Sequence, residues 1–292
     1  MRILVTGGSG RLGSTLVDRL MRDRRHEVLA WSGTTDDSRG AVTLRPVELT
    51  DGRGVAEALK AADPDAVIHA GALSSAEAVY RDPARGREVN VEATRRLAEW
   101  AGARGRRLVF TSTDLVFEGS RSWYREDDEA RPVLAYGRTK VEAEAHVVAT
   151  PGGLVARLSL LFGPNPSGRP GFFDLALEAL RRGEPRAFFR DEFRTPLDYR
   201  TAAVALVRLV ESDAVGIVHV GGRERLSRYE LMQRAAVVLG IDSGLVREGS
   251  LADATLPEPR PADASLDTSR LAGLCPALER RSIEAALDAA AP

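Results

Sequence analysis

A phenol and an ammonium group stand at a spacing that suits the reduction of a ketone. Tyr136 and Lys140 lie four residues apart in a stretch with helical character, so both side chains project from one face of the expected helix. A ketone that receives a hydride also needs a proton at its oxygen, which a phenol can donate. A neighbouring cation favours the ionised phenol and eases release of that proton. The chain's other lysine is Lys60, so the spacing predicts a proton donor at Tyr136 supported by Lys140.

Hydroxyl groups precede this pair at the end of an expected strand. The strand covers Arg107–Ser112 and leads into Thr113 and Asp114. Ligands of open α/β sheets bind at the carboxyl ends of the strands. A hydroxyl there can hydrogen-bond a substrate carbonyl and orient it beside the phenol. We expect Thr113 to be the third catalytic residue, with Ser112 as the neighbouring alternative and with Ser112 and Asp114 beside the substrate.

A glycine-rich segment, Thr6–Gly13, lies between the first expected strand and the first expected helix. Glycines let the backbone approach a pyrophosphate, and the helix start offers free N–H groups to the phosphates. The spacing fits both G-x-G-x-x-G and G-x-x-G-x-x-G, so it does not separate the two dinucleotide-binding subfamilies. The residues expected to bind the dinucleotide are Gly7, Gly10, Arg11, Leu12, Gly13, Ser32, Arg39, Leu49, Ala70, Gly71, Ala72, Tyr136 and Lys140.

The end of the second expected strand bears on the choice between NAD and NADP. An NAD site places Asp or Glu there for the ribose 2′-hydroxyl, whereas an NADP site lacks that carboxylate and has a cation nearby. The strand ends at Ser32 and Gly33 without an acid, and Arg39 follows in the loop beyond. Asp36 and Asp37 stand close enough to leave NAD open as the alternative. We favour NADP.

Alternating elements must hold these residues in place. Up to about residue 163, short β-rich runs at 2–6, 26–31, 41–47, 65–70, 107–112 and 153–161 alternate with helical stretches that include 85–103 and 134–150. This alternation predicts right-handed crossovers and an α/β fold with a doubly wound parallel sheet, a Rossmann fold. Proline and glycine mark a loop after Gly163. We expect a dinucleotide-binding domain at 1–163 and a smaller, interleaved C-terminal substrate lobe at 164–292, with a segment near 201–222 returning to the first domain.

Composition and charge exclude several classes of protein. The 292 residues are 43 % hydrophobic and 28 % charged, which is ordinary globular usage. With 41 basic and 42 acidic residues, no net field attracts nucleic acid or an anionic membrane. The lone Cys275 excludes an internal disulfide framework, and the four histidines show no metal-ligand spacing, so we expect no metal site. A strand-like start and the absence of long apolar runs predict a cytoplasmic protein without a signal peptide or membrane helix.

The glycine turn, Thr113, Tyr136 and Lys140 occur in the order found in extended short-chain dehydrogenases/reductases, which this chain resembles. Asn90, in the segment REVNVEAT, matches the asparagine that in this family supports the lysine through a water. Three further segments resemble the sugar-nucleotide-binding dTDP-4-dehydrorhamnose reductase branch: STDLVFEG (112–119), YREDDEARPVLAYGRTKVEAE (124–144) and RPADASLDTSRL (260–271).

This resemblance implies an NADPH-dependent reductase of a 4-keto nucleoside-diphosphate sugar, with a homodimer as its possible assembly. It also implies that the C-terminal lobe holds the sugar nucleotide, with Arg194 and Arg260 near its diphosphate. Arginine suits that role because its planar fork can hold two phosphate oxygens. The branch usually has Tyr where this chain has Leu115, and the segment HAGAL (69–73) also departs from it. The particular sugar therefore stays open.

Two alternatives remain. One is a nucleotide-sugar 4-epimerase with bound NAD. A 4,6-dehydratase is disfavoured, because dehydratases resembling this chain carry Asp-Glu after the threonine and here Asp114 is followed by Leu115. A non-catalytic NADP-binding regulatory subunit would keep the fold and lose the chemistry. The intact set of Thr113, Tyr136 and Lys140 favours the enzyme.

Overall fold

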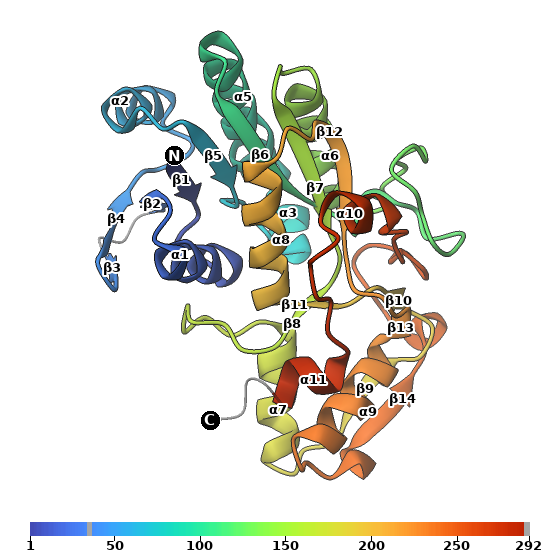
Figure 1. Ribbon diagram of the computed structural model, residues 1–292. Coiled ribbons are helices and arrows are strands. Elements are labelled where there is room, and N and C mark those ends of the chain that lie inside the picture. The colour runs from blue at the N-terminus through green and yellow to red at the C-terminus, as the bar shows by residue number, and fades with distance from the viewer. Residues whose placement is uncertain (34–36, 289–292) are drawn as a thin grey trace.

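A central β-sheet with helices on both faces forms the larger part of the molecule (Figure 1). The computed structural model describes residues 1–33 and 37–288, apart from the side chains of Asp37 and Arg39. Within these residues the sheet has eight strands in the spatial order β12-β7-β6-β5-β1-β2-β4-β3. Their bounds are β1 Arg2–Thr6, β2 Glu27–Ser32, β3 Asp37–Arg39, β4 Val42–Pro46, β5 Ala66–His69, β6 Arg107–Thr113, β7 Gly153–Leu158 and β12 Gly216–Val220.

The strand order confirms the doubly wound parallel sheet predicted from the sequence. All neighbouring pairs are parallel except the short β3, which pairs antiparallel to β4. β1 lies in the middle, with β2 on one side and β5 on the other, so the order reverses between β1 and β5. In such sheets the ligand crevice opens where the order reverses, outside the carboxyl ends of these strands.

Helices cover both faces of the sheet and explain why its central strands, β1, β5, β6 and β7, are almost entirely buried. On one face lie α1 (Arg11–Asp23) and α8 (Tyr199–Glu211), which pack against each other and share one core cluster. On the other face lie α2 (Gly52–Ala62), α5 (Ala93–Arg104) and α6 (Ala135–Val148), which share a second cluster. The three layers hold the carboxyl ends of the strands at one edge of the molecule.

The long helix expected at 85–103 is interrupted. After α3 (Ala76–Arg81), the structure has α4 (Pro83–Arg87), a π-helical turn (Glu88–Glu92) and then α5. Asn90 lies in the π turn, and its backbone carbonyl accepts a hydrogen bond from Thr94 Oγ1 at 2.7 Å. Single π turns inside helices occur often at functional sites, so this interruption draws attention to Asn90.

The C-terminal part contributes both to the sheet and to a separate lobe. β12 pairs with β7, and α8 packs on α1, so the segment at 199–220 lies against the sheet. The remaining elements build the lobe at the lower right of Figure 1, around its own apolar cluster. Its larger elements are α7 Phe172–Arg181, β9 Arg186–Phe189, α9 Arg228–Val238, β14 Val246–Gly249 and α11 Ile283–Asp288.

Short elements connect this lobe to the sheet. They are β8 Leu161–Phe162, β10 Phe193–Arg194, β11 Leu197–Asp198, β13 Leu226–Ser227 and α10 Ser269–Leu274. The domain boundary at residue 163 stays a prediction of the sequence. None of the helices in the described part of the chain is long and apolar enough to cross a membrane.

Candidate active site

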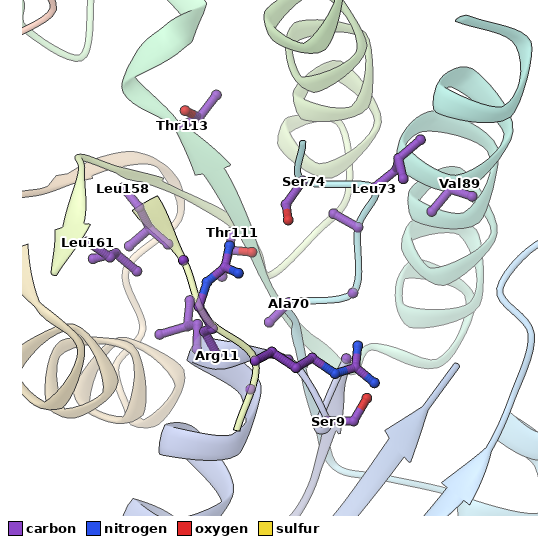
Figure 2. Close-up of a pocket in the computed structure, with 18 of the residues that line it drawn as sticks. Ser9, Arg11, Ala70, Leu73, Ser74, Val89, Thr111, Thr113, Leu158 and Leu161 are labelled. Atoms are coloured by element: carbon purple, nitrogen blue, oxygen red, sulfur yellow. The ribbon is translucent and has the colours of Figure 1, made fainter. Parts of the chain in front are cut away.

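A cleft of about 570 Å³ opens at the carboxyl ends of the strands, where the strand order reverses. Figure 2 shows that its lining comes from both parts of the molecule: Arg11, Ala70 and Thr111 from the sheet side, and Leu161 from beyond β7. Most of the residues predicted from the sequence line this cleft, namely Gly7, Gly10, Arg11, Leu12, Gly13, Ser32, Leu49, Ala70, Gly71, Ala72, Ser112, Thr113, Tyr136 and Lys140.

The glycine turn has the geometry that a diphosphate requires. Gly7 has φ +69°, and a Cβ built there would lie 2.7 Å from the Cα of Gly71, so the two loops touch backbone to backbone. A Cβ at Gly13 would lie 2.0 Å from the carbonyl oxygen of Gly7. α1 then begins after Gly10, with no side-chain cap and no acid in its first turn. Its first N–H groups and the positive end of its dipole therefore face the cleft with no acid in the helix's own first turn.

The end of β2 leaves room for a phosphate beside the ribose. Ser32 and Gly33 line the cleft, and a Cβ at Gly33 would meet no atom of the described residues within 4 Å. Arg85 lines the same cleft and pairs with Glu48 at 3.2 Å, which adds a cation that the sequence did not reveal. Asp36 and the side chain of Arg39 lie outside the described residues. The donors and the open space fit a dinucleotide, and the β2 end suits a 2′-phosphate.

Tyr136 and Lys140 reach the cleft together from the first turns of α6. Burial, and then the charge of Asp114, raises the pKa of the Tyr136 phenol. Lys140 is 1 % exposed, and its Nζ lies 4.1 Å from the centroid of the Phe110 ring. Burial lowers the pKa of Lys140 to about 7, against the opposing charge of Glu144. Burial favours the neutral, protonated form of the phenol. The support of the phenol by the Lys140 ammonium stays a prediction.

The hydroxyl of Thr113 lies at the end of β6, also on the cleft. Its Oγ1 accepts from the backbone N–H of Leu115 at 3.2 Å and donates to Asp114 Oδ1 at 3.3 Å. The Ser112 hydroxyl donates instead to the Glu144 carboxylate. Thr113 is therefore held at the cleft by hydrogen bonds with its own following turn, whereas the Ser112 hydroxyl already has a buried partner in Glu144.

Asp114 and Arg194 lie in a buried network rather than on the lining of the cleft. Asp114 Oδ2 accepts from Ser159 Oγ at 2.9 Å and lies 3.4 Å from Arg194 Nε, while burial raises the pKa of Asp114. Arg194 is 2 % exposed, and its Nη2 donates to Glu192 at 3.0 Å. Arg260 is more exposed, with its Nη1 3.8 Å from Glu192. Substrate contacts of Asp114, Arg194 and Arg260 stay predictions.

Asn90 also lies behind the cleft, where it joins two elements. Its Oδ1 accepts from Leu73 N at 2.9 Å, and its Nδ2 donates to Leu73 O at 3.2 Å and to Thr139 Oγ1 at 3.0 Å. The side chain thereby ties the loop after β5 to α6. The expected link from Asn90 to Lys140 through a water stays a prediction.

His69 is a buried structural residue in this geometry. It hydrogen-bonds Thr6 Oγ1 at 2.6 Å and Thr94 Oγ1 at 3.0 Å. Burial, and then the charge of Lys140, lowers its pKa to about 3, so the ring is neutral at physiological pH. Across residues 1–33 and 37–288, no three His, Cys, Asp or Glu side chains gather in a way that could hold a metal ion.

The sequence missed the part of the lining that comes from the C-terminal side. Arg169, Phe172 and Tyr199 line the cleft opposite the glycine turn. Arg11 bridges the two sides, because its Nε donates to Tyr199 Oη at 3.1 Å and its Nη1 to the Pro170 carbonyl at 3.3 Å. Nearly all 41 basic residues are arginine, so residue type gave no signal for Arg169.

Comparison with known proteins yields a family match over almost the whole chain. The family described as the RmlD substrate binding domain matches residues 1–290. A probable low-salt glycan biosynthesis reductase, Agl14 of Haloferax volcanii, is 30 % identical over 94 % of this chain and 92 % of its own length. A probable dTDP-4,6-dihydroxy-2-methyloxan-3-one 4-ketoreductase of Streptomyces antibioticus is 32 % identical over 97 % of this chain and 92 % of its own length.

Two further similarities extend the comparison. The methionine adenosyltransferase 2 subunit beta of Bos taurus is 27 % identical over 92 % of this chain and 81 % of its own length. The crystal structure of a hypothetical dTDP-4-dehydrorhamnose reductase from Sulfolobus tokodaii has a TM-score of 0.82 and 29 % identity, and covers 94 % of each chain. These relatives share the fold, and their descriptions include both reductases and a subunit of another enzyme.

Proposed function

Because the chain belongs to the RmlD substrate binding domain family, we propose that it reduces the 4-keto group of a nucleoside-diphosphate sugar with NADPH. The resemblance predicted from the sequence is thereby confirmed at the level of the family. The observation that carries the proposal is the convergence of Thr113, Tyr136 and Lys140 with the glycine turn on one cleft. Hydride transfer and protonation of the same carbonyl need these groups within reach of each other.

The cofactor would lie along the sheet side of the cleft. The uncapped start of α1 at Arg11 and Leu12 would hold its diphosphate, and Ser32 and Gly33 would face its adenosine ribose. The missing acid at the β2 end and the open space at Gly33 support NADP over NAD. When bound, the reduced nicotinamide supplies the hydride for the keto carbon.

The protein's own residues complete the reduction. Thr113 hydrogen-bonds the carbonyl oxygen and orients it toward Tyr136. The phenol donates its proton to that oxygen as the keto carbon becomes an alcohol carbon, and solvent later restores the phenol. The raised pKa of Tyr136 keeps the proton in place until negative charge develops on the substrate oxygen. Lys140 binds the nicotinamide ribose and lowers the cost of the phenolate that remains.

The substrate would enter from the side of Arg169, Phe172 and Tyr199. The Streptomyces relative is described as a ketoreductase of a dTDP-linked sugar, which supports a nucleotide sugar as the substrate class here. The size of the cleft, about 570 Å³, lies in the range of small-molecule and cofactor sites. The sugar and the base are to be identified by a thermal-shift screen of dTDP-, UDP- and GDP-sugars with NADP and with NAD.

Replacing Tyr136 with Phe tests the proton donor. We expect kcat to fall by about 10²-fold or more, because a positioned general acid contributes roughly that factor. The NADPH dissociation constant should stay within a factor of about three, since the phenol's hydroxyl is one small part of the cofactor surface. Absorbance at 340 nm measures turnover, and fluorescence titration measures binding.

Tyr80→Phe is the matched control, because Tyr80 is 46 % exposed on α3 and does not line the cleft. This variant should retain the kcat of the unaltered protein. Undiminished turnover in Tyr136→Phe would refute the role of the phenol.

The similarity to the methionine adenosyltransferase 2 subunit beta supports a second candidate, a non-catalytic NADP-binding regulatory subunit. NADPH binding without turnover of any sugar nucleotide, together with a co-purifying enzyme, would favour it. NAD retained through purification would favour the third candidate, a nucleotide-sugar 4-epimerase. A homodimer and a cytoplasmic location are further parts of the proposal, to be tested by light scattering and by cell fractionation.

A further inference from the structure

A third charged residue shares the face of α6 that carries the catalytic pair. Glu144 follows Lys140 by four residues and Tyr136 by eight, so the three side chains are stacked along one side of the helix. Glu144 is 4 % exposed, although glutamate in a helix ordinarily lies on the surface. It is not on the lining of the cleft, so it has no place in the proposed reaction so far.

The buried carboxylate binds residues from two neighbouring strands. Arg157 of β7 makes a bidentate ion pair with the Glu144 carboxylate: Nε lies 3.0 Å from Oε1, and Nη2 lies 2.7 Å from Oε2. The Ser112 hydroxyl of β6 donates to Oε1. The Arg157 guanidinium also stacks over the Phe117 ring at 5.1 Å from its centroid. Glu144 therefore ties α6 to the carboxyl ends of β6 and β7. Its partner on β6 is Ser112, the residue directly before Thr113.

A buried ion pair is not needed for stability, because desolvation of both charges offsets their attraction. Replacing a buried ion pair by apolar residues of similar volume is often neutral for stability. The charge itself has a second effect, since Glu144 opposes the loss of the ammonium form of buried Lys140. Arg157 reduces that effect by neutralising part of the field of Glu144.

We propose that Glu144, with Arg157 as its counter-charge, is a positioning residue that sets the charge on Lys140 and holds the Tyr136 face of α6 against Thr113. This inference rests on the proposed function for its meaning in catalysis. The electrostatic part can be tested without turnover.

The other titratable and charged groups around Lys140 come from β5, β7 and the turn after β6. His69 faces it from β5 and stays neutral above about pH 3. Asp114, in the turn after β6, acts on Tyr136. Arg157 of β7 pairs with Glu144, and the neutral Asn90 side chain of the π turn donates to Thr139, the residue before Lys140. Among the described residues, Glu144 and its partner Arg157 thus form the ion pair whose removal is expected to change the field at Lys140.

Removing Glu144 and removing Arg157 should shift the titration midpoint of Lys140 in opposite directions. Glu144→Gln removes the carboxylate and leaves Arg157 unpaired, so Lys140 loses its proton at a lower pH. Arg157→Met removes the guanidinium and leaves the carboxylate unopposed, so Lys140 keeps its proton to a higher pH. A merely structural role would weaken both variants without this change of sign.

The experiment follows the charge of Lys140 directly. Lys60 is exposed, so Lys60→Arg makes Lys140 the lone lysine of the chain without altering the cleft. In that background, NMR of ¹³C-labelled lysine gives the titration midpoint with saturating NADP. We expect the midpoint to move down by about half a pH unit or more in Glu144→Gln, and up by about as much in Arg157→Met.

The limb of the kcat profile that depends on Lys140 should move with the NMR midpoint, while KM for NADPH changes less than kcat. Glu144→Gln/Arg157→Met, which removes both charges, should return the midpoint toward that of the parent. Glu142→Gln is the matched control on the same helix, because Glu142 is exposed and pairs with Arg87 outside the site.

Shifts in the same direction in both single variants, or no shift in folded variants, would overturn the inference. Circular dichroism and NADP binding establish that each variant is folded, and the double variant serves if one single variant is not. If the parent turns over no sugar nucleotide, the proposed function fails, whereas the NMR midpoints still decide the role of Glu144.

Discussion

Tyr136 and Lys140 respond to the same surroundings in opposite ways. Burial raises the pKa of the phenol and lowers the pKa of the ammonium to about 7. A group is driven by burial toward its neutral form, which for tyrosine is the acid and for lysine is the base. The phenol is thus loaded with the proton that a ketone reduction consumes. Because the pKa of Lys140 lies near neutral pH, its charge depends on nearby charged residues such as Glu144.

Asn90→Ala tests the residue that joins the β5 loop to α6. Its side chain makes three hydrogen bonds with Leu73 and Thr139, and it is 1 % exposed. Truncation leaves buried partners unsatisfied, so we expect the free energy of unfolding to fall by about 2–3 kcal/mol. Urea denaturation measures this change.

The chain's second asparagine provides the comparison for Asn90. Asn165 is half-buried in a loop and bonds Ser167 and Asp174. Asn165→Ala should therefore cost about 1 kcal/mol or less, because water can replace its partners. Equal losses of unfolding free energy in the two variants would show that the Asn90 hydrogen bonds do not stabilise the fold more than those of Asn165.

Among the elements, the β1 turn and α1 depend on two backbones lying in contact. Gly7 touches Gly71 of the β5 loop, and Gly13 sits over the carbonyl oxygen of Gly7. These contacts bring the helix start close to the strand ends, where the N–H groups meet the diphosphate. A side chain at Gly13 has no flexible neighbour to displace, because the atoms it would meet belong to the backbone.

Gly13→Ala should therefore weaken NADP binding by about tenfold or more, since a shift of α1 misplaces its N–H donors. The NADP dissociation constant is measured by calorimetry. Gly273→Ala in α10 is the matched control, because a Cβ there meets nothing within 4 Å. The control should bind NADP normally and gain up to about 1 kcal/mol of stability. Normal NADP affinity in Gly13→Ala would contradict the role of the glycine turn in placing the α1 N–H groups at the diphosphate.

For the whole molecule, two buried histidines make stability depend on pH. Burial lowers the pKa of both His69 and His219 to about 3. In the unfolded chain a histidine titrates near pH 6.5, so between pH 6.5 and 3 the unfolded state binds protons that the folded state does not. The free energy of unfolding therefore falls as pH decreases through this window.

At pH 5 each histidine should lower the free energy of unfolding by on the order of 2 kcal/mol relative to pH 8. His219→Gln should remove about half of their joint contribution. His219 suits the test because it is fully buried and its Nδ1 lies 3.1 Å from the Asp267 carbonyl oxygen. Urea denaturation at both pH values provides the measurement. A pH dependence unchanged in His219→Gln would argue against a neutral, buried ring.

The sequence by itself was sufficient for features that depend on neighbours along the chain. Strand runs buried on both faces, the glycine turn before α1 and the four-residue spacing of Tyr136 and Lys140 are local patterns, and they predicted the sheet and most of the cleft. The π turn at Asn90 was missed, because a one-residue change in helical pitch leaves no mark on hydrophobic periodicity.

Tertiary structure decided the features that depend on residues far apart in sequence. Arg11 meets Tyr199, Arg194 is enclosed with Asp114, and Glu144 is buried against Arg157, and none of these pairings follows from spacing in a chain so rich in arginine. The protonation states of Tyr136 and Lys140 also depend on residues that are far apart in the sequence. Residue type fixes which groups can ionise, whereas the cost of ionising them depends on how much water and which charges the folded chain leaves around them.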